Sequence, residues 1–127
     1  MGVMTLRFLK VEQAAAAANA HLGPTAPDSR WVYTFVMQFE YDERKNAVNV
    51  AKHGIDLADA AWVFADPMRL DAVDQRREYG EPRRVVVGAV LGRVWVVVYT
   101  LRGEAVRLIS ARKANEREQK RYQDLRA

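Results

Sequence analysis

The sequence predicts an α+β fold, in which two N-terminal helices and a C-terminal helix cover one face of an antiparallel sheet of about four to five strands. Three observations predict this fold. Capped segments with helical hydrophobic spacing fill residues 42–67, β-branched and aromatic runs alternate with short turns over residues 68–110, and helical composition returns over residues 114–125. A chain of 127 residues is long enough for one small domain with a core.

The first 36 residues differ in composition from the rest of the chain. They contain the run Ala14–Ala18, which favours a helix but adds little hydrophobic surface, and a Gly- and Pro-containing stretch at residues 23–29. We therefore expect an Ala-rich N-terminal extension and linker over residues 1–36 and a folded domain over residues 37–127. Two alternatives for the extension are that it is disordered or that Met37 is the natural start.

The folded domain is expected to begin with a strand within residues 31–41, followed by a helical hairpin. Asp42 is a natural N-cap for a helix over residues 43–53, and Gly54 supplies the left-handed residue that ends it. The apolar residues expected on the buried face of this helix are Ala47, Val48 and Ala51.

The second helix of the hairpin is expected to start at Asp56 and to end before Pro67. Its predicted buried stripe consists of Leu57, Ala60, Ala61 and Phe64.

The second half of the domain has the pattern of a strand meander closed by a charged helix over residues 114–125. Residues 68–74 alternate and predict an edge strand, whereas residues 94–100 are apolar on both faces and predict a central strand. The remaining strands are expected at residues 84–91 and 104–110, with turns at residues 92–93 and 102–103.

The composition excludes several chemistries. The absence of cysteine excludes disulfides, Cys-based zinc and Fe–S sites and thiol catalysis, and two histidines leave little room for a metal site. No Gly-x-Ser-x-Gly elbow is present. The apolar stretch near the N-terminus is too short and weak for a secretory signal or a membrane span, so we expect a cytoplasmic protein. The residue composition described above leads us to expect no cofactor.

The net charge of +4 weakly favours a polyanionic partner, although many small basic domains are simply soluble proteins. Residues 37–127 carry 13 Arg and 4 Lys. Arginine suits forked contacts to phosphate, but a genome of high G+C content would explain the same excess.

The C-terminal end of the first expected helix and the N-terminal start of the last one are candidate sites. His53 and Lys52 lie in the last turn of the first helix, where they could hold a phosphate and exchange a proton, or merely cap free carbonyls. Arg112 precedes the N-terminal amides of the last helix, which form a natural anion site.

Arginines on the expected sheet form a third candidate. Arg83, Arg84 and Arg93 could bind phosphate while Tyr79 or Tyr99 stacks a base, or they could only keep the sheet from pairing with other chains. The mixed charges of residues 71–78 favour a solvated loop.

The order of these motifs resembles the BrnT-type toxins of bacterial type II toxin–antitoxin systems, from about Phe39 to Tyr122. The matching segments are Phe39-Glu40-Tyr41-Asp42, Lys52-His53-Gly54-Ile55, Val63-Phe64-Ala65-Asp66-Pro67, Val97-Val98-Tyr99-Thr100 and Arg107-Leu108-Ile109-Ser110-Ala111-Arg112-Lys113-Ala114. The most specific parts are Lys-His-Gly after a short helix and Ser-Ala-Arg before the last one.

The resemblance implies a RelE-like fold and a metal-independent RNA endonuclease that arrests translation. It also implies a cognate ribbon-helix-helix antitoxin, encoded beside the toxin, that neutralises it and alone contacts operator DNA. A heterotetramer of two toxins and two antitoxins is the assembly that the resemblance suggests.

Metal-free RNA cleavage uses the ribose 2′-hydroxyl as nucleophile and needs an acid, a base and cations. The motif match assigns catalytic roles to Lys52, His53 and Arg112, and placement adds Arg93. The expected RNA-binding residues are Arg83, Arg84, Tyr99 and Lys113. His21 lies outside the match and receives no role.

Two other readings compete with the ribonuclease. A decayed toxin would bind RNA or an antitoxin on the same basic surface without cleaving. Direct DNA binding is the weaker alternative, because no segment has the composition of a recognition helix.

Overall fold

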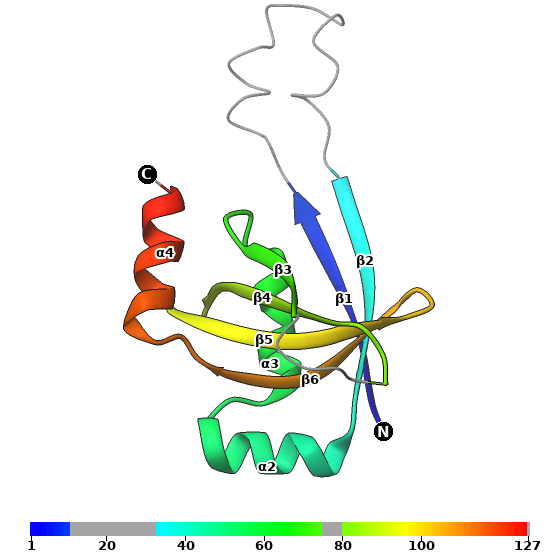
Figure 1. Ribbon diagram of the computed structural model, residues 1–127. Helices are drawn as coiled ribbons and strands as arrows, with labels where there is room; N and C mark the ends of the chain where they lie inside the picture. Colours follow the sequence, from blue (N-terminus) through cyan, green and yellow to red (C-terminus); the bar gives the residue numbers. More distant parts are fainter. Residues whose placement is uncertain (11–32, 75–79, 127) are drawn as a thin grey trace, which may run out of the picture. The chain divides into compact units, whose positions relative to one another are not determined.

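The computed structural model describes residues 1–10, 33–74 and 80–126 of the chain (Figure 1). The chain divides into two compact units, Met1–Met4 with Gln38–Ala127, and Thr5–Met37. The alanine run, the linker-like stretch, His21, Tyr79 and residues 75–78 of the predicted loop lie outside the described residues. The extension over residues 1–36 and the alternative start at Met37 stay predictions.

A strand that the sequence did not predict, β1 (Gly2–Lys10), opens the chain. Gly2 is buried, and a Cβ atom there would come within 2.2 Å of the Tyr41 ring. Because any side chain would collide with that ring, glycine is the residue that permits this approach.

The sheet has six strands in the order β1-β2-β6-β5-β4-β3 (Figure 1). The strands that follow β1 are β2 (Tyr33–Tyr41), β3 (Leu70–Asp74), β4 (Arg83–Val90), β5 (Arg93–Arg102) and β6 (Ala105–Lys113). Strands β3 to β6 form an antiparallel meander. As predicted, β3 is an edge strand and β5 lies in the interior of the sheet.

The expectation of a purely antiparallel sheet of four to five strands is wrong. Strand β2 pairs in parallel with β6, with Phe39 opposite Val106 and Tyr41 opposite Leu108. The helical segment after β2 leads to β3 at the far edge, and the meander then returns to place β6 beside β2. A crossover of this kind is how a parallel pair arises, and the sheet is therefore mixed.

The helical hairpin is confirmed. Helix α2 (Glu43–His53) starts at Asp42, whose carboxylate accepts hydrogen bonds from the backbone N–H groups of Arg44 (2.9 Å) and Lys45 (3.1 Å). These bonds hold the pKa of Asp42 below its ordinary value. Gly54, with a φ of +73°, ends the helix in the left-handed conformation that glycine adopts at little cost.

The second helix differs from the prediction in length. One α-helical turn, α3 (Leu57–Ala60), continues as the 3₁₀ helix η2 (Ala61–Ala65). The predicted buried stripe is confirmed, because its four members are each no more than 8% exposed. The C-terminal helix α4 (Glu116–Arg126) starts two residues later than expected, and its Tyr122 is buried.

The helical segment and the sheet meet at an aromatic cluster. The ring of Phe64 lies 5.4 Å from that of Phe39 and 5.0 Å from that of Tyr99, measured between centroids. Beside them η2 approaches β4 closely, because a Cβ atom on Gly88 would lie only 2.8 Å from Val63. Aromatic side chains bury large areas, so this cluster is a main source of core stability.

Asp66, directly after η2, connects three elements. One carboxylate oxygen accepts from the N–H of Met68 (2.9 Å), and the other accepts from the N–H of Ala89 on β4 (2.8 Å) and from the hydroxyl of Tyr122 on α4. This explains why a carboxylate follows the helical segment: it supplies acceptors to two backbone groups and to the last helix.

The predicted buried face of α2 is wrong. Ala47, Val48 and Ala51 are exposed, with Val48 62% exposed, and the residue that α2 buries is Asn49. The Asn49 side chain donates to the carbonyl of Ile55 (3.0 Å) and accepts from the N–H of Ala111 on β6 (3.0 Å). Helix α2 is therefore attached to the sheet by an amide rather than by an apolar stripe.

No helix within the described ranges is long and apolar enough to cross a membrane.

Candidate functional site

A pocket of about 390 Å³ lies where the C-terminal end of α2 meets the end of β6. Its lining contains three of the four predicted catalytic residues and one of the predicted RNA-binding residues. The lining residues are Lys52, His53, Gly54, Arg112 and Lys113. Two segments about sixty residues apart in the sequence thus form one basic site.

Asn49 fixes the relative placement of these two segments. It lies one helical turn before His53, and its two hydrogen bonds reach the loop after α2 and the residue before Arg112. A second asparagine, Asn46, donates to Asp56 (3.1 Å) and accepts from the N–H of Leu57 (2.8 Å). The end of α2 that carries Lys52 and His53 is therefore held in place by several side-chain hydrogen bonds.

Arg112 is paired with a carboxylate of the next helix. Its two terminal nitrogens donate to the two oxygens of Glu118, both at 2.8 Å. Glu118 also accepts from the N–H of Asn115 (2.9 Å), while its own N–H donates to the Asn115 side chain (2.8 Å), which is a capping box. The anion site expected at this helix start is thus occupied by the protein's own carboxylate.

The remaining predicted residues lie elsewhere on the sheet. Arg84 donates to the hydroxyl of Tyr99 (3.1 Å) and pairs with Asp71 (3.3 Å), and the Tyr99 hydroxyl donates to Asp71 (2.6 Å). Arg83 lies opposite Asp74 in the register, and Arg93 is exposed at the start of β5. Neither of the last two lines the pocket of Lys52 and His53. Their roles stay predictions.

Burial and, second to it, the hydrogen bond to Asp71 together raise the pKa of the Tyr99 phenol from 10.0 to about 12. The folded protein therefore keeps a proton that the unfolded chain releases above pH 10, so the free energy of unfolding falls as the pH rises from about 10 to 12. We expect the free energy of unfolding of Tyr99→Phe to fall by about 2 kcal/mol less over this pH range than that of the wild type. Urea unfolding of both proteins between pH 8 and 12 measures it, and equal declines would contradict the assignment.

A groove of about 350 Å³ adjoins the pocket and shares Lys52 and His53 with it. The groove runs between α2 and β6, which lie side by side in Figure 1. Its other lining residues are Arg44, Lys45, Val48, Asn49, Ile109 and Ser110.

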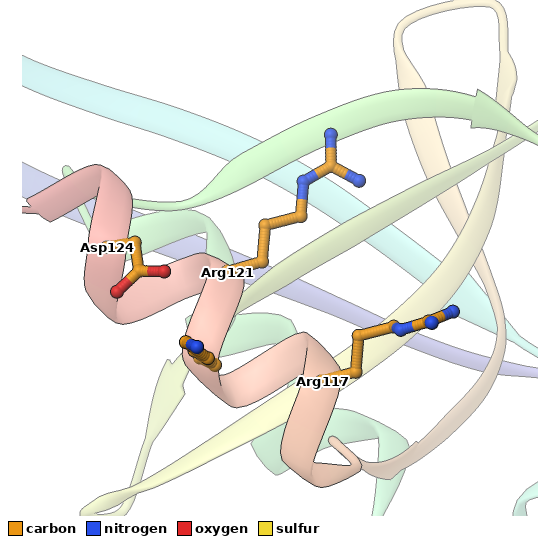
Figure 2. A pocket seen from close by; sticks show the side chains of 4 residues that line it. Arg117, Arg121 and Asp124 are labelled. Atoms are coloured by element: carbon orange, nitrogen blue, oxygen red, sulfur yellow. The ribbon is translucent and has the colours of Figure 1, made fainter.

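A further basic pocket, of about 560 Å³, was not predicted from the sequence. Arg117, Lys120, Arg121 and Asp124 of α4 line it, and Arg117 and Arg121 extend from the helix toward the same side (Figure 2). The signal in the sequence was the spacing of three cations by three and four residues on one helix.

The cations of the molecule fall into two groups. Arginines of the sheet pair with carboxylates, as in Arg84–Asp71, Arg102–Glu81, Arg107–Glu40 and Arg112–Glu118. By contrast, the described residues contain no ion-pair partner for Arg44, Lys45, Lys52 or Lys113. The described residues also contain no ion-pair partner for Arg117, Lys120 or Arg121 of α4. The positive charge that is available to an external anion therefore lies in two places, around α2 with the end of β6 and on α4.

The described parts of the chain contain no group of three or more His, Asp or Glu placed to hold a metal ion.

The fold and the pocket define a small basic α+β protein in which uncompensated cations surround one histidine, an arrangement suited to a polyanionic ligand. A family model described as the ribonuclease toxin BrnT of type II toxin–antitoxin systems matches residues 41–118. The chain belongs to this family. Its members are ribonuclease toxins, so the family implies RNA cleavage and an antitoxin partner. No curated protein matches the sequence.

Proposed function

We propose that this protein is a metal-independent RNA endonuclease with a RelE-like fold, and that it cleaves RNA in the pocket of Lys52, His53 and Arg112. The observation that supports this most strongly is that the pocket combines residues 52–54 with residues 112 and 113, which are distant in sequence and all lie within the matched region. No other described pocket combines the histidine of the matched region with cations from two elements.

In this mechanism the ribose 2′-hydroxyl attacks the adjacent phosphorus, and the bond to the 5′-oxygen breaks. His53 acts as the base that removes the 2′-proton or as the acid that protonates the 5′-oxygen. Lys52, Arg112 and Lys113 offset the charge that builds on the phosphorane, which is the largest electrostatic requirement of the reaction. Arg93, which is exposed at the start of β5, is assigned to offsetting phosphate charge, and Arg83 and Arg84 to binding the RNA farther along the sheet. Tyr99 is only 3% exposed and packs against Phe64, so its ring does not stack a base.

The test is incubation of the purified protein with RNA in the presence and absence of EDTA. We expect equal cleavage in both, and a loss of roughly a hundredfold or more in Arg112→Ala, because one charge-stabilising donor is removed. The matched control is Arg102→Ala, which removes an arginine that also pairs with a glutamate but lies outside the pocket. Loss of activity only with EDTA would contradict the metal-free mechanism, and full activity of Arg112→Ala would contradict the site.

Glu118 should weaken RNA binding, because its carboxylate accepts from both terminal nitrogens of Arg112, which could otherwise donate to a phosphate. Glutamine can replace glutamate in a capping box, so Glu118→Gln should keep the helix start intact. We expect this variant to bind uncleavable RNA severalfold more tightly, with a steeper salt dependence. Fluorescence anisotropy at several salt concentrations measures the change, and weaker binding in Glu118→Gln would contradict the expectation.

We further propose that a ribbon-helix-helix antitoxin, encoded beside the toxin, neutralises it in a heterotetramer and carries the contact with operator DNA. Expression of the toxin alone should arrest translation and growth, and coexpression of the neighbouring gene should restore both. Growth arrest that the neighbour does not relieve would contradict this partner.

The alternative is a toxin that has lost catalysis and only binds RNA or antitoxin. The pairing of Arg112 with Glu118 is the observation that favours it, because a committed arginine is a weaker phosphate ligand. The cleavage assay separates the two functions, since a decayed toxin would bind RNA without shortening it.

A further inference from the structure

The part of β6 that lines the groove beside the pocket is an irregular stretch of the strand. In the pairing of β5 with β6, Val98 lies opposite Ser110 and Tyr99 opposite Leu108, so Ile109 is the extra residue of a β-bulge. Bulges reorient side chains next to functional sites. Here Ile109 and Ser110, which are adjacent in sequence, both line the groove.

The wall opposite Ile109 is the exposed side of α2. Val48, which the sequence assigned to the core, is 62% exposed and lines the groove together with Ile109. Arg44 and Lys45 lie one turn before Val48, and Lys52 lies one turn after it, so cations border an apolar surface. This combination matches a nucleotide, which has an apolar base face and a charged phosphate.

We infer that the groove between α2 and β6 is a second subsite, which binds the nucleotide that follows the two joined by the scissile phosphate in the cleavage pocket. Val48 and Ile109 contact the base, while Arg44 and Lys45 bind the phosphate that follows it. The inference rests on the proposed function, because the two sites are continuous through Lys52 and His53 and one RNA strand crosses both. The volume of about 350 Å³ lies within the range of about 300–1,000 Å³ of small-ligand sites.

The observations favour RNA over an acidic protein segment as the occupant. The substrate is a polymer, so a strand held in the pocket must leave it along an adjacent surface. The groove is the neighbouring cavity that shares residues with the pocket among those described, and its cations have no described carboxylate partner.

The experiment measures the binding of 2′-O-methyl oligonucleotides of two and six residues by the full chain. Blocking the 2′-oxygen removes the nucleophile, so binding is measured without cleavage. We expect the longer oligonucleotide to bind the wild type about tenfold or more tightly than the shorter one. Arg44→Ala/Lys45→Ala should lose most of this gain and reduce the slope of log affinity against log salt by about 1.4, or about 0.7 per contact.

Three comparisons make the test decisive. Ile109→Ala should reduce the length-dependent gain without changing the salt slope, because it removes only an apolar contact. The control Lys120→Ala/Arg121→Ala removes the same charge from α4, and an equal loss there would overturn the subsite. Unchanged RNA binding but weaker antitoxin binding by Arg44→Ala/Lys45→Ala would also overturn it, in favour of a protein occupant.

Cleavage assays distinguish failure of the subsite hypothesis from failure of the proposed ribonuclease function. Arg44→Ala/Lys45→Ala should cleave a dinucleotide at the wild-type rate, because both residues lie outside the cleavage pocket. A wild type that binds the longer oligonucleotide more tightly but cleaves no RNA would refute the ribonuclease and keep the subsite. A wild type that cleaves RNA but binds both lengths equally would refute the subsite alone.

Discussion

His53→Ala should lower the rate of RNA cleavage by roughly a hundred- to ten-thousandfold, the contribution typical of a positioned general acid or base. His53 is the last residue of α2 and lines the pocket with Arg112 and Lys113. Its replacement removes the group that exchanges a proton, whereas the phosphate-binding cations remain. The loss should therefore fall on kcat, with little change in the affinity for uncleavable RNA.

The chain provides its own control for this prediction. His21→Ala removes the second of its two histidines, which lies outside the matched residues 41–118, and should cleave at the wild-type rate. Single-turnover cleavage and circular dichroism of the variants measure activity and folding. A folded His53→Ala protein with wild-type kcat would exclude His53 as the acid or base.

Asp66→Ala should lower the free energy of unfolding by about 2–4 kcal/mol, which is the largest stability effect we expect from a polar residue here. The substitution leaves the N–H groups of Met68 and Ala89 and the hydroxyl of Tyr122 without their acceptor. The loss of the acceptor carries a desolvation cost mainly at Tyr122, which is buried, whereas Met68 and Ala89 are exposed residues. Chemical unfolding monitored by fluorescence measures the change.

Asp59→Ala is the matched control. Asp59 lies in the same helical segment and is exposed, and its carboxylate forms no hydrogen bond with a described residue. Its replacement should change the free energy of unfolding by less than about 0.5 kcal/mol. Equal destabilisation by the two substitutions would contradict the assignment of the stability effect to the three acceptor contacts of Asp66.

Local signals predicted most of the elements correctly. Asp42 and Gly54 specify the two ends of α2 through capping bonds and a positive φ, which depend on neighbouring residues alone. The apolar run of β5 predicted an interior strand correctly, because this pattern also lies within one short segment of the sequence. Strand β1 and the parallel pairing of β2 with β6 escaped prediction, because they depend on contacts between segments distant in the sequence.

The orientation of α2 escaped prediction for a different reason. Alanine and valine on one helix face usually predict burial, yet here a single amide, Asn49, forms two buried hydrogen bonds that align the helix on β6. Two well-placed hydrogen bonds outweighed the small apolar area of Ala47 and Ala51. The sequence does not show this, because the partners of Asn49 are the carbonyl of Ile55 and the N–H of Ala111.

The candidate site was predicted in part. The motifs pointed to Lys52, His53 and Arg112, and the structure brings all three to one pocket. Charge counting could not distinguish Lys52, which has no ion-pair partner among the described residues, from Arg84 and Arg112, which pair with Asp71 and Glu118. Whether a cation is available depends on the distance to a carboxylate, and that distance is set by strand register rather than by composition.

The distance in sequence between α2 and β6 also determines when the site can form during synthesis. The chain emerges from the ribosome with its N-terminal end first, so α2 is available long before β6. The pocket needs both, and the hydrogen bond between Ala111 and Asn49 cannot form until Ala111 has been synthesised. We therefore expect a nascent toxin to lack its cleavage site until the last strand is complete, so the ribosome that makes it is not exposed to an active enzyme during elongation.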